Sequence, residues 1–221
     1  VCDADLDELQ SLIDKSLVRR WASGRFGMLE TIHEYARGRL DEAGESAETG
    51  RRHAEHFLAV ARSTNLGTES DGPGNPELAR LERANFRAAL QWAIEEDETE
   101  LGLGLVVALS HFWISEAPFE GPRWYETLLA ETDDADQALR AAALRDYGGV
   151  VYIVGEFDRG VALYEASLAL YRELGDEWGV SHMLHRFAAE AIRVGDFDKA
   201  RALTEEALST AHRLGDRRGE S

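Results

Sequence analysis

The chain has 221 residues, 44% of them hydrophobic, so it is long enough to form one or two domains with a substantial core. Its 42 acidic residues outnumber its 24 basic residues, and the resulting net charge of −18 repels phosphate backbones and anionic membrane surfaces. We therefore expect this chain to make no direct contact with nucleic acid or membrane.

Residues 1–44 predict the C-terminal part of a winged-helix domain with one β-hairpin. Leucine and isoleucine recur at helical spacing at the start, and two short β-like runs follow. The short connection between these runs contains Gly24, which suits the turn of a hairpin. The expected elements are a helix at 5–15, strands at 17–21 and 25–29, and a second helix at 30–43 that ends at Gly44.

Residues 45–98 are expected to form a helical connector. Helical patterns over 48–63 and 77–95 flank a loop at 64–76, which holds three glycines and two prolines. An uncharged apolar run at 101–114 follows; it is too short to span a membrane and predicts a buried helix.

The strongest pattern is a repeat, because residues 155–179 recur as residues 195–219, forty residues later. A fixed period of this size is typical of a helical array in which each unit packs on its neighbours. We therefore interpret residues 99–221 as tetratricopeptide-like repeats. The predicted fold is all-α, with helical hairpins that form a right-handed solenoid truncated at the C-terminus. An eroded earlier copy is expected at 100–115 and 123–131.

Glycines and aspartates mark the helix ends within each repeat. Gly155 and Gly195 are expected to end helices, since glycine enters the left-handed conformation without steric cost. Asp158 and Asp198 are expected to cap the helices that follow, through their carboxylates. The Gly-Asp pair at 175–176, which also recurs forty residues on, is expected to close one helix and open the next.

Five ordered motifs carry a resemblance to a known family. They are Leu12–Val18 (LIDKSLV), Phe26–Ala36 (FGMLETIHEYA), Arg52–Leu58 (RHAEHFL), Leu81–Trp92 (LERANFRAALQW) and Glu120–Trp124 (EGPRW). In this order the chain resembles the winged-helix end and repeats of bacterial signal-transducing ATPases of the NB-ARC (STAND) type, which are often transcriptional regulators. The resemblance implies an upstream ATPase core that binds ATP or ADP, a relaying winged helix, a sensor array, and often a DNA-binding or other output domain.

This family has a Met-His-Asp signature whose histidine helps to hold ADP, and the matching residues here are Met28, Leu29 and Glu30. Leucine cannot donate a hydrogen bond to a phosphate, so we expect Leu29 to be a core residue. No Walker A pattern occurs in the chain, so it is expected to hold no cofactor of its own and to hydrolyse no ATP.

Neither a catalytic nor a metal site is expected from the sequence. The pairs His53/His56 and His182/His185 each lack the further ligands that zinc requires. Cys2 is the only cysteine, so no internal disulfide can form, and a reducing, cytoplasmic compartment is expected.

The remaining candidate site is the concave face of the repeats, which the first helix of each hairpin is expected to line. The residues placed there are Arg145, Tyr152, His182, His185 and Arg193. Cationic and aromatic groups on an otherwise acidic protein would suit an anionic or carboxylate-bearing effector, either a small molecule or a protein. Two alternatives stay open: further repeats cover this face, or it packs on the ATPase core.

The sequence thus predicts a regulatory segment of a bacterial signal-transducing ATPase regulator. Because Val1 is not an initiator methionine and the last repeat is incomplete, we expect a piece of a longer protein. The exposed edge of that repeat predicts concentration-dependent self-association. A stand-alone adaptor for protein–protein binding is the second hypothesis, and an enzyme with a site between helices is a distant third.

Overall fold

The structure of the chain is a computed structural model that describes residues 5–21, 24–68, 74–130 and 136–215. Cys2, residues 22–23 of the hairpin connection, residues 69–73 of the predicted loop and Asp216 lie outside the described residues. The chain forms two compact units, Val1–His56 and Phe57–Ser221, and each unit is described by itself.

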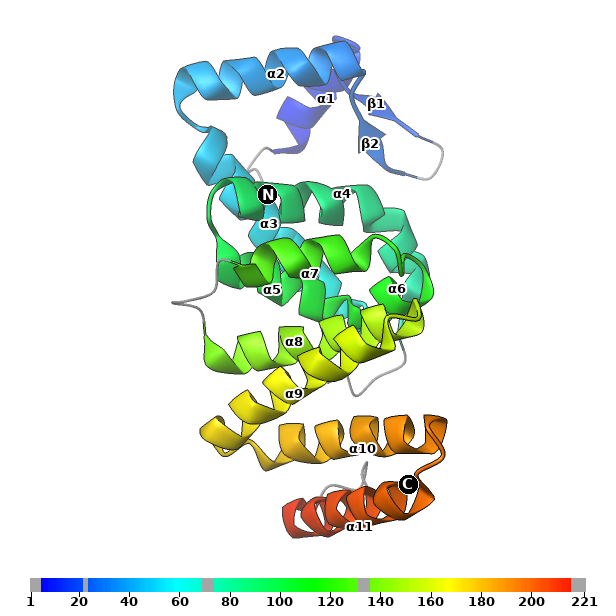
Figure 1. Cartoon of the computed structure of the whole chain (residues 1–221). Coiled ribbons are helices and arrows are strands. Elements are labelled where there is room, and N and C mark those ends of the chain that lie inside the picture. The colour runs from blue at the N-terminus through cyan, green and yellow to red at the C-terminus, as the bar shows by residue number, and fades with distance from the viewer. Residues whose placement is uncertain (1–4, 22–23, 69–73, 131–135, 216–221) are drawn as a thin grey trace. The chain divides into compact units, whose positions relative to one another are not determined.

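The first unit contains the predicted order of helix, hairpin and helix (Figure 1). Its strands pair in antiparallel fashion, with Arg19 opposite Gly27 and Arg20 opposite Phe26. A left-handed Gly44, with φ of 72°, ends the second helix as predicted. The elements are α1 (Leu6–Asp14), β1 (Arg19–Arg20), β2 (Phe26–Gly27), α2 (Glu30–Ala43) and α3 (Ser46–Ser63), which crosses the division between the units.

The expectation that Leu29 is a core residue is wrong, because 44% of this residue is exposed. Leu29 occupies the N-cap position of α2, and neither α1 nor α2 buries a side chain completely. Among the described residues of this unit, the buried hydrophobic residues are Val18 and Ala54. With so few buried apolar residues, this unit has no core large enough to enclose the side chain of Leu29.

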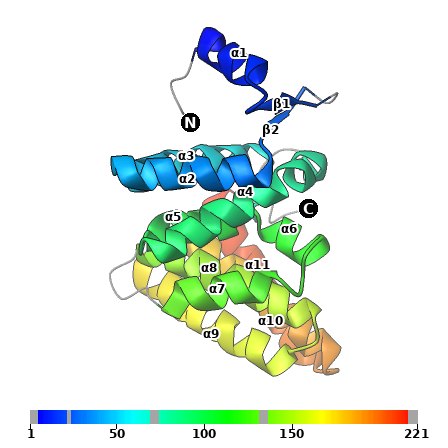
Figure 2. The same ribbon diagram turned by 90° about the horizontal axis from the view of Figure 1, so that it is seen from above.

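Every secondary-structure element among the described residues of the second unit is a helix, which agrees with the predicted all-α class. Its helix α8 packs against α5, α6 and α7 on one side and against α9 on the other, as Figures 1 and 2 show. The elements are α4 (Pro76–Glu95), α5 (Thr99–Ala108), α6 (Ser110–Ser115), α7 (Gly121–Ala130), α8 (Gln137–Ile153), α9 (Phe157–Leu174), α10 (Glu177–Arg193) and α11 (Phe197–Leu214).

One predicted helix, at 100–115, is two helices in the structure, with a break at Leu109. The amide of His111 donates to the carbonyl of Leu66, 2.8 Å away in the connector loop, and so leaves the helical ladder. The carbonyl of Val106 accepts instead from the indole of Trp113 at 3.2 Å and from the hydroxyl of Tyr125 at 2.8 Å. Tertiary partners therefore replace the local hydrogen bonds that a continuous helix would make.

The helix ends in the repeats follow the glycine pattern but not the predicted caps. Gly155 and Gly195 have φ of 93° and 83°, as expected for residues that end helices. The predicted caps Asp158 and Asp198, however, lie in the first turns of α9 and α11, because these helices begin one residue earlier than each aspartate. Asp196 caps α11 by accepting from the amide of Lys199 at 3.1 Å.

The two hairpins, α8–α9 and α10–α11, share a contact that follows the forty-residue period. The hydroxyl of Ser167 on α9 donates to the carbonyl of Ala141 on α8 at 2.8 Å. At the equivalent positions the roles are exchanged, because Ser181 on α10 donates to Ala207 on α11 at 3.1 Å. Both hairpins thus join their helices at the same level by a buried serine hydroxyl.

A close approach of α8 and α9 depends on a glycine. A Cβ atom on Gly148 would lie 2.6 Å from the ring of Tyr164 and 3.1 Å from the carbonyl oxygen of Gly160. Tyr164 belongs to the core cluster of Ala141, Tyr164, Leu168, Tyr171 and Met183, which joins the first hairpin to α10.

Candidate functional site

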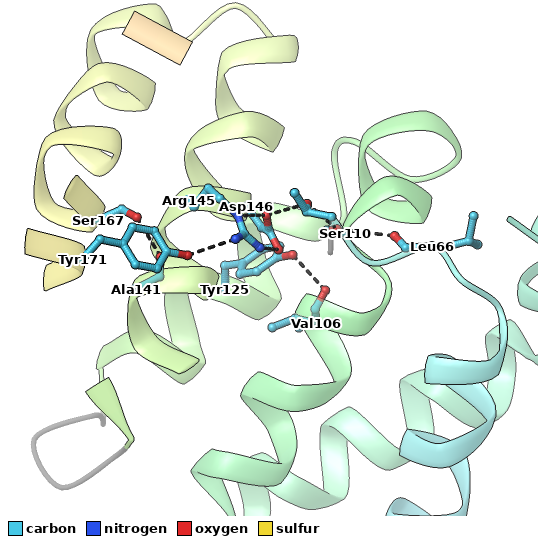
Figure 3. Close-up of polar contacts among 10 residues, drawn as sticks. Leu66, Val106, Ser110, Tyr125, Ala141, Arg145, Asp146, Ser167 and Tyr171 are labelled. Atoms are coloured by element: carbon cyan, nitrogen blue, oxygen red, sulfur yellow. Dashed lines mark hydrogen bonds and ion pairs between the residues drawn. The ribbon is translucent and has the colours of Figure 1, made fainter. Parts of the chain in front are cut away.

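A buried ion pair lies at the centre of the second unit. Arg145 and Asp146 are neighbours on α8, and their side chains are 1% and 3% exposed. The guanidinium donates from Nε to Oδ1 of Asp146 at 2.8 Å and from Nη2 to Oδ2 at 3.2 Å (Figure 3). This two-point geometry compensates part of the large cost of removing both charges from water.

The pair is joined to three other segments of the unit. Arg145 donates from Nη1 to the hydroxyl of Tyr171 on α9 at 2.9 Å, and Thr68 donates to Oδ1 of Asp146 at 2.9 Å. The Thr68 hydroxyl also lies 3.1 Å from that of Ser110 on α6. We call these five residues the Arg145 network; it connects the loop after α3 to α6, α8 and α9.

On the α10 side, Arg145 lies over an aromatic residue that contacts a histidine. Its Cζ atom is 5.7 Å from the ring centre of Trp178, and that ring is 5.3 Å from the ring of His182. Burial lowers the pKa of His182 to about 3, with further lowering by the charges of Arg186, Arg145, His185 and His111. The imidazole is therefore neutral at pH 7, and its buried Nε2 has no hydrogen-bond partner among the described residues.

A second polar cluster joins the two hairpins through Glu190 on α10. Its Oε2 accepts from the hydroxyl of Tyr152 and from Nε of Arg193, each at 2.7 Å. The hydrogen bond from Arg193 is the main cause that lowers the pKa of Glu190 to about 2. The Cζ atom of Arg193 also lies 4.3 Å from the ring centre of Phe157, whose ring is 4.9 Å from that of Tyr152.

Four of the five predicted groove residues therefore fall into two pairs, and the fifth, His185, belongs to neither. The structure links Tyr152 to Arg193 through Glu190, and Arg145 to His182 through Trp178, while His185 is exposed on α10. Arg145 faces the interior, where Asp146 holds it.

Sequence reasoning missed the residues that join these groups: Asp146, Trp178 and Glu190. Asp146 directly follows Arg145 on a helix that is otherwise rich in alanine, glycine and valine. An Arg-Asp pair within so apolar a helix was the sequence signal that could have indicated a buried ion pair. The family positions Met28, Leu29 and Glu30 lie in the other unit, at the start of α2.

Arginines of α4 form a third polar cluster, with a glutamate before α7. Glu120 accepts from Nε of Arg87 at 2.7 Å, from Arg83 at 3.1 Å and from the indole of Trp124 at 3.2 Å. The hydrogen bond from Arg87 is the main cause that lowers the pKa of Glu120 to about 2. Arg87, Glu120 and Trp124 line an open surface depression together with Arg123, and Glu120 is the carboxylate that pairs with Arg83 and Arg87 there.

No three histidine, cysteine or acidic side chains gather in metal-binding geometry in the part of the chain that the structure describes. Over the same residues, none of the helices is both long and apolar enough to cross a membrane.

The comparisons with known proteins point to transcriptional regulators. The chain is 31% identical over 183 residues to one protein of Mycobacterium bovis and to proteins of two strains of Mycobacterium tuberculosis. Their names describe them, provisionally, as HTH-type transcriptional regulators. The match covers 77% of this chain but 21% of each relative, so the chain spans about a fifth of the length of the curated relatives it matches. No protein-family model matches the chain.

Proposed function

We propose that this chain is the regulatory segment of a transcriptional regulator of the signal-transducing ATPase type. In this proposal the hairpins form a tetratricopeptide-like sensor that binds an effector or partner protein. The winged-helix part relays binding to a nucleotide-binding core elsewhere in the protein. The observation that carries the proposal is the similarity to the mycobacterial regulators over 77% of the chain.

The Arg145 network supplies a physical basis for coupling within the second unit. It connects the hairpin helices α8 and α9 to α6 and to the loop that follows α3. A ligand that binds the hairpins differently in two conformations shifts their equilibrium by its difference in affinity. A shift in α8 would move Asp146 and so change the hydrogen bond that it accepts from Thr68, whose hydroxyl in turn contacts that of Ser110.

The experiment starts from the reading frame that encodes this chain. We expect a P-loop upstream and a helix-turn-helix elsewhere in the same gene product. Tagged gene product should then occupy discrete DNA sites in chromatin immunoprecipitation, and deletion of residues 137–215 should change the rate of ADP release as well as the transcripts of the adjacent genes. A frame without a P-loop and without a helix-turn-helix, whose deletion leaves every transcript unchanged, would refute the proposal and favour an adaptor.

A further inference from the structure

A phenylalanine on the turn between α6 and α7 lies almost entirely in water. Phe119 is 86% exposed, which is the largest exposed fraction among the large hydrophobic residues that the structure describes. Burying an aromatic side chain is favourable, so contact with a partner would lower the free energy of this ring. Single exposed apolar residues are common on protein surfaces, so the surroundings of the ring decide whether it marks a contact site.

Ion pairs on both sides of the ring hold its turn against α4. Glu116 accepts from Nε and Nη2 of Arg80 at 3.0 and 2.6 Å. Glu120 accepts from Nε of Arg87 at 2.7 Å, and its own amide donates to the carbonyl of Ala117 at 3.0 Å. The turn is therefore held in place before any partner binds, and contact with a partner costs little further conformational entropy.

A surface depression lies directly beside this turn, because Glu120 is one of its walls. The depression is open, has a volume of about 530 Å³, and is lined by Arg87, Ala88, Gln91, Glu120, Arg123 and Trp124. Cζ of Arg123 lies 5.7 Å from the ring centre of Trp124. A lining that combines an indole with a cation suits a second aromatic ring. We call Phe119 and these six residues the Phe119 patch.

The Phe119 patch has no excess of acidic side chains. It contains two arginines and one glutamate, within a chain of net charge −18. Two copies of so acidic a chain repel each other, so a contact between copies is favoured where arginines at least balance carboxylates. The charge of the patch therefore suits a second copy of the chain.

We propose that the Phe119 patch joins two copies of this chain, with the Phe119 ring of each copy in the depression of the other. The patch holds both an exposed ring and a depression, so it is complementary to itself. A contact about a two-fold axis uses the same patch on both copies and buries both rings at once. This dimer goes beyond the proposed sensing function and does not depend on it. It also differs from the self-association predicted at the edge of the last repeat.

Sedimentation equilibrium of the whole chain, over a wide range of concentrations, measures the Kd of the dimer. We expect Phe119→Ser to raise this Kd at least roughly thirtyfold, because an aromatic anchor is lost from both halves of the contact. The matched control is Phe197→Ser, which removes a ring that is 67% exposed at the start of α11 on the last hairpin. This control should keep the wild-type Kd. Since both rings are exposed, both variants should also keep the wild-type circular dichroism.

A mixture of two variants tests whether the ring of one copy enters the depression of the other. Ala88 is exposed at the depression, and Ala88→Glu places there a longer side chain that the two arginines of the lining attract. Ala88→Glu and Phe119→Ser should each lose the dimer when studied alone. Their equimolar mixture should associate, though more weakly than the wild type, because the ring of the Ala88→Glu copy still meets an open depression on the Phe119→Ser copy.

Three outcomes would overturn the proposal. A wild-type chain that stays monomeric up to its highest soluble concentration would leave the patch to a different protein. A Kd that rises in Phe197→Ser and not in Phe119→Ser would assign the contact to the edge of the last repeat. A mixture that associates no better than its two components would rule out the exchange of rings between copies.

Discussion

Replacing Asp146 by alanine tests whether the buried ion pair holds the second unit together. The substitution would leave the guanidinium of Arg145, which is 1% exposed, without its carboxylate, and Thr68 would lose its acceptor. Removing one partner of a buried pair costs about 3–5 kcal/mol, because the remaining charge stays out of water. For a unit of this size, we expect the melting temperature to fall by on the order of 10 °C.

The measurement is urea and thermal unfolding of the whole chain, followed by circular dichroism. Glu126→Ala is the matched control, since it removes a carboxylate that is 67% exposed and pairs with Arg159 at 3.2 Å. Exposed pairs contribute less than about 1 kcal/mol, so this variant should unfold close to the wild type.

A double variant separates a lost charge balance from lost packing. Arg145→Met with Asp146→Leu removes both charges, and we expect it to be at least about 1 kcal/mol more stable than Asp146→Ala alone. If the double variant were less stable than Asp146→Ala, or if Asp146→Ala and Glu126→Ala unfolded alike, the argument from burial would be refuted.

Three further predictions concern the repeats. Gly148→Ala should lower the free energy of unfolding by about 1–3 kcal/mol, because the added Cβ meets the neighbouring helix. Gly149→Ala, whose Cβ would have its nearest neighbour at 3.6 Å, should raise the free energy of unfolding by about 0.5–1 kcal/mol. Both are measured by urea unfolding, and equal effects would contradict the packing. Ser167→Ala and Ser181→Ala should each cost about 0.5–1.5 kcal/mol in the same assay, and a loss from only one would show that the hairpins are not equivalent. The pKa of His182 is about 3 in the folded chain against 6.5 in the unfolded chain, so between these pH values the unfolded state binds a proton on His182 that the folded state does not bind. The free energy of unfolding should therefore fall as the pH drops below 6.5, by at most about 1.4 kcal/mol per pH unit. The His182→Asn variant should lose less of this free energy than the wild type between about pH 6.5 and 5. Parallel stability–pH curves for the two proteins would refute this explanation.

Local signals in the sequence were sufficient to locate most helices and the hairpin. Gly155 and Gly195 end helices because a residue without a Cβ atom adopts a positive φ at no steric cost, whatever surrounds it. The forty-residue period follows from units that repeat the same contacts. The serine contacts of α9 and α10 were also present in the pattern, as an exchange of serine and alanine at equivalent positions.

The burial of particular polar groups could not be predicted in this way. Helical spacing placed Arg145 on the face that lines a groove, but its burial depends on Tyr171, 26 residues away, and on the segments that cover α8. The break at Leu109 likewise requires the carbonyl of Leu66, which accepts from the amide of His111.

The sequence by itself therefore determined where most helices lie and how they repeat, because helix position depends largely on the steric preferences of neighbouring residues. Only the tertiary structure decided which charges are paired in the interior and which stay exposed, because charge burial and pairing depend on partners from distant parts of the chain.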